Sequence, residues 1–412
     1  MTGRGPATYL LVGGVCGLTW AAALRGWMVQ LARDQSTFSW MTFALLIIPA
    51  AAVGVTVGWA AYLRAGGRRP PAWSVWSPAL LAVAVLDPTI FSALIHTGEG
   101  GGSLGVVVTA LAGGHALSRR RWSVTRVASS LLAATGLLLM LFTGSMAGPM
   151  TSARGAWVSL LGVSLLLLLC LAASVPHATG PTLGRTGLVA VGGLAGAAWA
   201  AGLRSFMTEV AGAESEVHWG NTFGYIVLPG IVAGALLGWA EAERRAGRRR
   251  AWLALSPLTF TVILLVHFWQ LPSLAQDGIG GGAIGVPVMG IVGGYALCGR
   301  GSSVGRCLAA VLFFCGLLLW ALTATSVGGP SLGLGTAHGL WATTLYYGLL
   351  TTLALAVSIP LRTAVPPAHP GQARPRPTAH GLSEVRRGPV ERVRNPSRCP
   401  ALISHVALRR FP

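Results

Sequence analysis

The chain has 412 residues, of which 53% are hydrophobic and only 10% are charged, a composition that excludes an ordinary soluble domain. The formal net charge is +19, and all 30 basic residues are arginines. Such an excess can indicate nucleic-acid binding, but most of these arginines stand in short clusters between apolar runs or in the C-terminal tail. This distribution argues against a nucleic-acid partner and indicates a polytopic protein of the lipid bilayer.

Twelve apolar segments are candidates to cross the bilayer, which needs about 20 apolar residues per helix. In chain order they are residues 9–31, 40–63, 73–96, 101–117, 124–144, 156–175, 187–207, 222–242, 252–271, 280–298, 307–325 and 338–359. The fourth and tenth segments are short and rich in glycine, so a re-entrant loop is the alternative for each. The sequence therefore predicts an all-α integral membrane protein with twelve transmembrane helices.

The charged residues of the loops favour spanning over re-entrance. If every segment spans, one side carries Arg4, Arg64, Arg68, Arg69, Arg119, Arg120, Arg121, Arg126, Arg185, Arg244, Arg245, Arg248, Arg249, Arg250, Arg300 and Arg306. The other side then carries Arg33, Asp34, Glu99, Arg154, Glu209, Glu214, Glu216 and Asp277. Because cytoplasmic loops are the arginine-rich ones, both termini are expected in the cytoplasm and the protein in the plasma membrane. The loops are too short to hold a soluble domain.

The sequence repeats itself with a shift of about 180 positions. The run from Trp20 to Arg25 returns from Trp199 to Arg204, and many glycines return at matching positions. We expect a first six-helix repeat at residues 1–178, a second at 179–361 and a disordered tail rich in proline and arginine at 362–412. Six spans per repeat give both repeats the same orientation, so they should be parallel and related by a pseudo-two-fold axis along the membrane normal.

Arg25 and Arg204 hold equivalent positions in the first helix of each repeat. An arginine within a span is costly and usually faces a partner or an aqueous cavity. One interpretation is substrate binding, in which both arginines contact an anionic solute in a central cavity. The other is structural, either an ion pair or a side chain that extends to the membrane surface.

Asp87 and His267 align in the third helix of each repeat, deep in apolar sequence. One interpretation is a gate or a protonatable pair that couples transport to a proton gradient. The alternative is that Asp87 pairs with Arg25 while His267 makes a neutral hydrogen bond. Pro88 directly follows Asp87, which predicts a local kink.

Glycines form two further patterns. The runs Gly100, Gly101, Gly102 and Gly280, Gly281, Gly282 precede the fourth and tenth helices, and as an anion nest they could hold a negative group, although Glu99 and Asp277 beside them would repel it. Glycines at four-residue spacing predict close helix packing, which could also permit sliding. They are Gly13/Gly17, Gly54/Gly58, Gly101/Gly105, Gly192/Gly196, Gly234/Gly238 and Gly281/Gly285.

The loops after the second span of each repeat, residues 58–69 and 238–249, loosely resemble the glycine–acid–arginine–glycine–arginine loop of major facilitator transporters. That family carries the loop at the same two places of a six-plus-six arrangement. The spacing here differs by one residue, and the first copy lacks the acid. The resemblance covers about a dozen residues per repeat and serves only as an analogy.

No nucleophile, zinc-protease or phosphate-loop motif is present, and the cysteines form no CxxC pair, so no catalytic residue, metal or cofactor is expected. The basic tail has ten arginines and two glutamates and is able to contact anionic lipid headgroups, with no role as the alternative. The sequence predicts a secondary transporter of a small solute, anionic if the arginines bind it. The alternative is a membrane scaffold or an intramembrane enzyme of the cell envelope.

Overall fold

The computed structural model describes residues 5–33, 36–96, 101–118, 123–177, 183–212, 215–262 and 281–363. Within these ranges every regular element is a helix, and all of them belong to one folded unit. The elements of residues 1–178 are α1 Pro6–Ala32, η2 Phe43–Ile47, α2 Ile48–Ala65, η3 Ala72–Leu86, α3 Pro88–His96, α4 Gly101–Leu117, α5 Val124–Gly144, η4 Ser145–Ala147 and α6 Ala153–Ser174. Those that follow are α7 Arg185–Ala211, η6 Trp219–Val227, α8 Leu228–Arg245, η7 Ala251–Thr261, α11 Gly281–Leu297, α12 Ser303–Gly328, η9 Pro330–Leu332 and α13 Ala337–Leu361.

Eight helical segments are long and apolar enough to cross a membrane. They comprise α1, α2 with the π-helical turn before it, α5, α6, α7, α8 with its π-helical turn, α12 and α13. The shorter apolar helices η3, α4 and α11 accompany them. This set of apolar helices indicates an all-α, multi-pass membrane protein.

The third predicted span is not one continuous α-helix. Residues 72–86 form a 3₁₀ helix, the chain becomes extended at Asp87 with ψ of 122°, and α3 begins at Pro88. The residue before a proline disfavours the helical region, so the break falls where the sequence predicts a kink. The ninth predicted span likewise begins as the 3₁₀ helix η7, and its residues 263–271 lie outside the described part of the chain.

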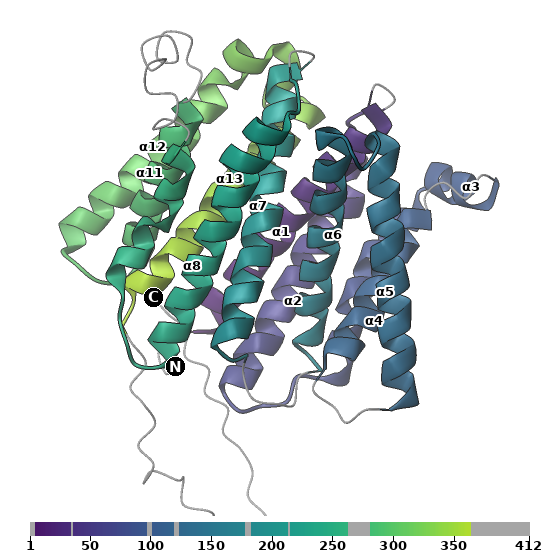
Figure 1. Cartoon of the computed structure of the whole chain (residues 1–412), viewed down its shortest axis with the longest axis horizontal. Helices are drawn as coiled ribbons and strands as arrows, with labels where there is room; N and C mark the ends of the chain where they lie inside the picture. Colours follow the sequence, from purple (N-terminus) through teal and green to yellow (C-terminus); the bar gives the residue numbers. More distant parts are fainter. Residues whose placement is uncertain are drawn as a thin grey trace, which may run out of the picture. The chain divides into compact units, whose positions relative to one another are not determined.

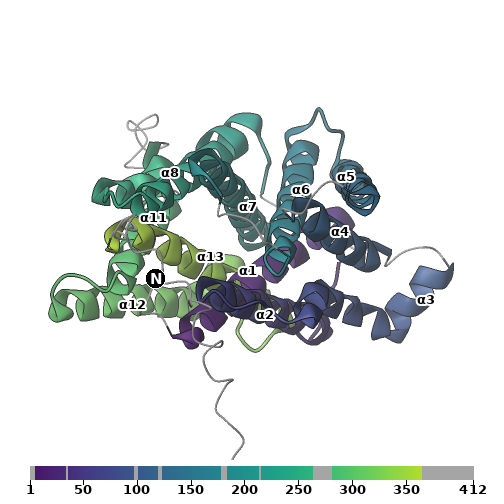
Figure 2. The same cartoon turned by 90° about the horizontal axis from the view of Figure 1, so that it is seen from below.

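Four helices form the centre of the bundle: α1, α6, α7 and α13 (Figures 1 and 2). The helices α2, α4 and α5 lie on one side of this group, and α8, α11 and α12 lie on the other (Figure 2). The central core includes the side chains of Trp157 and Trp341, which are both fully buried. Residues 1–178 and 179–361 therefore meet along the first and last long helices of each range.

Glycines let α1 approach α2, and α7 approach α8, to backbone contact. A Cβ atom added to Gly13 would overlap the carbonyl of Gly54, and one added to Gly192 would overlap that of Gly234. The predicted packing role is confirmed at these positions. It is wrong for Gly105 and Gly285, because an added Cβ atom at either position would meet no atom of the described residues within 4 Å.

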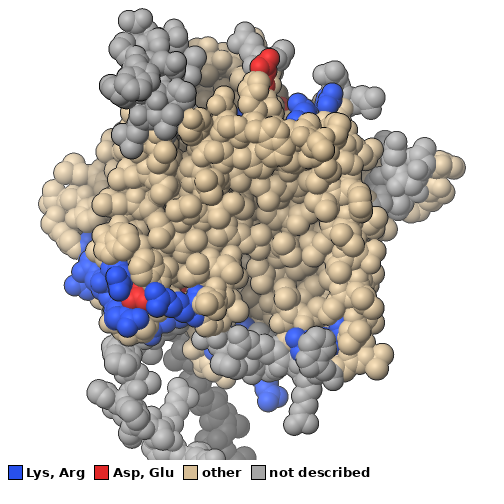
Figure 3. Space-filling view, viewed as in Figure 1, with Lys and Arg blue, Asp and Glu red and all other residues tan. Residues whose placement is uncertain are grey.

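The charged residues divide between the two ends of the bundle. The arginine-rich end, where α1 begins and α8 ends, carries Arg64, Arg185, Arg244, Arg245, Arg248 and Arg250. In Figure 3 blue atoms lie along the lower edge of the molecule and are densest at lower left. The opposite end, where α1 and α7 finish, carries Arg25, Arg33, Arg154, Arg204 and Glu209. Arginines are thus more numerous at one end of the bundle, a distribution typical of multi-pass membrane proteins.

Candidate functional site

A cavity of about 550 Å³ lies where residues 1–178 meet residues 179–361, the two predicted repeats. Its walls come from α1, α2, η3 and α6 of the first repeat and from α7, α8, η7 and α13 of the second. Ligand pockets in proteins typically measure about 300–1,000 Å³, so the cavity has the size of a small-molecule site. It is the candidate functional site among the described residues.

Equivalent positions of the two repeats line this cavity together. The pairs are Gly13 and Gly192, Cys16 and Ala195, Gly17 and Gly196, Trp20 and Trp199, Gly54 and Gly234, Leu165 and Leu349, and Leu168 and Thr352. The offset within a pair is about 180 residues for the early helices and 184 for α6 and α13, as Trp157 and Trp341 illustrate. The repeated Trp20 and Trp199 that the sequence singled out thus belong to one site.

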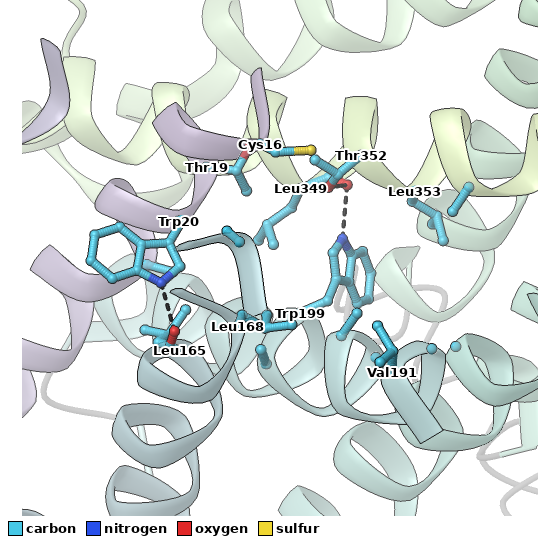
Figure 4. A pocket seen from close by; sticks show the side chains of 18 of the residues that line it. Cys16, Thr19, Trp20, Leu165, Leu168, Val191, Trp199, Leu349, Thr352 and Leu353 are labelled. Carbon is cyan, nitrogen blue, oxygen red and sulfur yellow. Dashed lines mark hydrogen bonds between the residues drawn. The ribbon is translucent and has the colours of Figure 1, made fainter. Parts of the chain in front are cut away.

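The cavity is apolar because its polar side chains are bonded to the protein (Figure 4). The indole of Trp20 donates to the carbonyl of Leu165, and that of Trp199 to the carbonyl of Leu349, both at 2.8 Å. Thr19 and Thr352 each donate to a carbonyl of their own helix. The cavity therefore offers mainly hydrocarbon and ring surface to a ligand.

Helices α1 and α7 meet through equivalent residues from Ala23, at the edge of the cavity, onward. A Cβ atom built on Gly202 would lie 3.4 Å from that of Ala23, and one built on Gly26 would lie 3.3 Å from that of Ser205. Both pairs join positions that the repeat offset of 179 makes equivalent. Small side chains in register thus let the two helices pack closely on the side of the cavity nearer the end of α1.

Two tryptophans at equivalent positions form hydrogen bonds across this junction in opposite directions. Trp157 on α6 donates a 3.1 Å hydrogen bond to the carbonyl of Ala201 on α7. Its equivalent, Trp341 on α13, donates a 2.9 Å bond to the carbonyl of Ala22 on α1. Ala22 and Ala201 are themselves equivalent, so the last helix of each repeat binds the same position of the other repeat's first helix.

A polar cluster lies between α1 and α7 near the last residues of both helices, at the end of the bundle opposite the arginine-rich end. Gln30 donates a 3.0 Å hydrogen bond to Glu209, its equivalent on α7. Arg154 donates to the amide oxygen of Gln30 at 3.1 Å, and Nε2 of His338 lies 3.4 Å from the Glu209 carboxylate. Arg154 and His338 are also equivalent. The sequence analysis did not assign this cluster, although the repeat offset could have paired its residues.

Arg25 and Arg204 do not line the cavity. Arg25 donates to Ser36 and to the carbonyl of Thr37, and Arg204 donates to Ser215 and to the carbonyl of Glu216, which are equivalent partners. Each guanidinium also stands over an aromatic ring, of Phe38 and of Trp157 respectively. These contacts fix the loops that follow α1 and α7, and a substrate-binding role for either arginine stays a prediction.

The other predicted site residues are not brought together within the described chain. Asp87 lies half-buried at the break between η3 and α3, and His267 lies outside the described residues. Gly100 and Gly280 are also outside them, while Gly101 and Gly281 begin α4 and α11. Cβ atoms added to Gly102 and Gly282 would meet nothing within 4 Å. Gating and anion binding by these residues stay predictions.

The arginine-rich end holds a network around two glutamates. Glu243 is 1% exposed and accepts hydrogen bonds from Arg248 and Arg250, with Arg185 at 3.7 Å. The hydrogen bonds that Arg248 donates to the Glu243 carboxylate raise the pKa of Arg248 above its ordinary value. Glu241, which lines the cavity, accepts bonds of 2.7–2.8 Å from Arg244 and of 2.7 Å from Arg245. The positions equivalent to the two glutamates are Ala61 and Leu63, so the network exists in the second repeat alone.

The described residues contain no group of three or more side chains arranged to hold a metal ion. No family model, curated protein or solved structure matches the chain. Its function must therefore be argued from the cavity and from the helices that close it.

Proposed function

We propose that this protein is a plasma-membrane transporter that carries a solute with an apolar body through the cavity between two six-helix repeats. Its twelve helices would alternately expose that cavity to the two sides of the membrane. The arginine-rich end, and with it both termini, would face the cytoplasm. The observation that carries this proposal is a cavity lined by equivalent residues of both repeats.

The contacts between α1 and α7 support a pseudo-two-fold axis along the membrane normal. Residues on a two-fold axis meet their own equivalents. Ala23, Gly26 and Gln30 each face their equivalent on α7, at three successive levels of the helix. Two helices perpendicular to the axis would bring only one such pair together, so contacts at three levels favour an axis parallel to both helices.

The lengths of the shorter helices η3, α4 and α11 support three further spans beside the eight long ones, which accounts for eleven of the twelve. A 3₁₀ helix rises about 2 Å per residue, so the 15 residues of η3 extend about 30 Å, the thickness of the hydrocarbon core. The 17-residue helices α4 and α11 extend about 25 Å at 1.5 Å per residue. Slight local thinning of the bilayer would accommodate this difference.

The position of the cavity supports transport over a passive role. Its lining extends along α1 and α7 from Gly13 and Leu188, near the arginine-rich end, to Ala23 and Trp199. Further along both helices, the small residues of the α1–α7 contact and the two reciprocal tryptophans fill the junction. A site between related halves that is closed on one side is the arrangement from which the halves can rock to open the other side.

Cysteine labelling tests the proposal, because Cys16 lines the cavity. One variant keeps only Cys16, and a second variant without native cysteines carries Ala195→Cys at the equivalent position. Both thiols should react with a membrane-impermeant maleimide added to inside-out vesicles, and more slowly when it is added to right-side-out cells. A variant that keeps only Cys315, exposed on α12 outside the cavity, is the control and should react mainly with a permeant reagent.

Labelling of both cavity thiols from each side would support alternating access. Labelling from one side only, whatever the conditions, would contradict transport and favour the alternative of a scaffold or an intramembrane enzyme. The same assay on Arg25→Cys and Arg204→Cys tests whether a solute pathway reaches the two arginines.

A further inference from the structure

One end of the cavity is lined by apolar side chains and the other lies close to arginines. This difference in polarity indicates a class of ligand. From Gly17 to Trp199 the walls present hydrocarbon and rings whose polar groups are already bonded. At the arginine-rich end the lining finishes at Ala172, Leu188, Glu241 and Ile359, each close to an arginine of its own or of a neighbouring helix. The site thus has an apolar body and a charged mouth.

Four arginines lie within about one helical turn of these lining residues. Arg185 precedes Leu188 by three residues on α7, and its guanidinium stands over the ring of Trp239. Arg362 directly follows α13, three residues after Ile359, and donates to the hydroxyl of Ser358. Arg64 of α2 donates to the carbonyl of Val175, which is three residues beyond Ala172. Arg244 of α8 is bonded to Glu241 in the cavity wall.

Two glutamates offset only part of this positive charge. Glu241 pairs with Arg244 and Arg245, and Glu243 pairs with Arg185, Arg248 and Arg250. Five arginines therefore share two carboxylates. The side chains of Arg185 and Arg248 stay 59% and 60% exposed, and a guanidinium has five N–H donors, more than the contacts with Glu243 use. An anionic group placed there would restore the balance of charge.

We propose that the ligand of the cavity is an anionic membrane lipid, with an acyl chain between the repeats and its phosphate at the arginines of the mouth. Guanidinium groups bind phosphate through paired N–H donors, and basic pockets between transmembrane helices on the cytoplasmic side hold such headgroups. A small polar anion would find no partner in the apolar body, and a zwitterionic lipid would leave the excess charge without a counter-ion. This inference rests on the proposed function, because it names the substrate of the same cavity.

Lipid binding to the purified full-length protein tests this inference. The delipidated protein in detergent would be titrated with phosphatidylglycerol and with phosphatidylcholine of identical chains, and bound lipid would be counted by native mass spectrometry. Glycerol phosphate, which has the charge without the chains, forms a third arm. We expect phosphatidylglycerol to bind preferentially and glycerol phosphate to compete weakly.

Five variants test separately how the arginines near the charged end and the apolar part of the cavity contribute to lipid binding. Arg185→Gln and Arg244→Gln should each weaken phosphatidylglycerol binding about fivefold, whereas Arg300→Gln, at the same end but away from the lining, should not. Ala195→Phe should block the body of the cavity and weaken both lipids, whereas Leu11→Phe, exposed on α1 outside the lining, should weaken neither.

Glu241→Gln provides a test that loss of folding cannot imitate. This change releases Arg244 and Arg245 from their carboxylate, so phosphatidylglycerol should bind about fivefold more tightly while phosphatidylcholine is unchanged. Equal binding of the two lipids by the unmodified chain, or complete competition by glycerol phosphate together with normal binding by Ala195→Phe, would overturn the inference.

The transport proposal and the lipid proposal can be contradicted independently of each other. If anionic lipid binds selectively but the Cys16 and Ala195→Cys thiols react from one side only, the lipid is a static ligand and transport is wrong. If both thiols react from each side but lipid selectivity is absent, transport stands and the lipid assignment is wrong.

Discussion

Gln30 and Glu209 hold equivalent positions in the two repeats, and the amide of Gln30 donates a 3.0 Å hydrogen bond to the Glu209 carboxylate across the α1–α7 junction. This hydrogen bond directly joins two polar side chains at equivalent positions. The difference between amide and carboxylate is what allows the bond to form, because two glutamates at this separation would repel each other.

Removal of this carboxylate should weaken the junction. Glu209→Ala takes the acceptor from Gln30 and the charged neighbour from His338, so we expect a loss of about 1–2 kcal/mol in unfolding free energy. Glu209→Gln keeps an acceptor for Gln30 and should lose less. Thermal unfolding of purified protein in detergent measures both, and equal melting temperatures for all three forms would contradict a role for the cluster.

Trp157 and Trp341 should contribute similar amounts to the free energy of unfolding. Trp157→Phe and Trp341→Phe each remove one hydrogen bond between the two halves, and such bonds between membrane helices are worth about 0.6–2 kcal/mol. Trp320→Phe is the matched control, because that indole nitrogen makes no hydrogen bond to the described residues. A loss for Trp320→Phe as large as for the other two would show that ring size, not the bond, determines the effect.

The glycine contact between α1 and α2 should not tolerate a methyl group. Gly13→Ala places a Cβ atom on the carbonyl of Gly54, so the helices must separate, at a cost of about 1–3 kcal/mol. Gly105→Ala adds the same atom in open space on α4 and should be neutral. The yield of monodisperse protein and its melting temperature check both, and similar values for the two variants would argue against backbone contact.

A disulfide should link the two repeats at the α1–α7 contact. In the double variant Ala23→Cys, Gly202→Cys the Cβ atoms would lie about 3.4 Å apart, close to the separation found in disulfides. After cutting at a protease site inserted in the segment 178–182, the oxidised protein should run as one band on a non-reducing gel. The pair Ala23→Cys, Gly193→Cys, at different levels of the helices, should run as two bands.

The buried carboxylate of Glu243 should protect its loop from proteolysis. Trypsin must bind a free arginine, and Arg248 and Arg250 are held by Glu243 at 2.7 and 3.2 Å. Glu243→Ala should therefore speed cleavage after residues 248–250, which peptide mapping over time measures. Glu216→Ala removes the same charge from an exposed position at the opposite end and should leave these cleavage rates unchanged.

The sequence by itself determined the class of fold and the long helices. Apolar runs predicted α5 at the residues the structure assigns, because hydrocarbon length fixes the length of a spanning helix. The glycines of α1 and α7 predicted close helix packing. A glycine has no side chain to keep a neighbouring helix away, and its positions can be read from the sequence alone. Helix type was not predictable for residues 72–86, where the run is equally apolar in a 3₁₀ and an α conformation.

Only the tertiary structure decided which of the repeated residues form the site. Arg25 and Arg204 were the most prominent pair in the sequence, yet their guanidinium groups bind the loops of their own repeats. Trp20 and Trp199 line the cavity, and Gln30 meets Glu209, because the two first helices pack in register against each other. The repeat offset states which residues are equivalent. Which equivalents face each other depends on how the helices pack, and that is set by contacts among residues far apart in the chain.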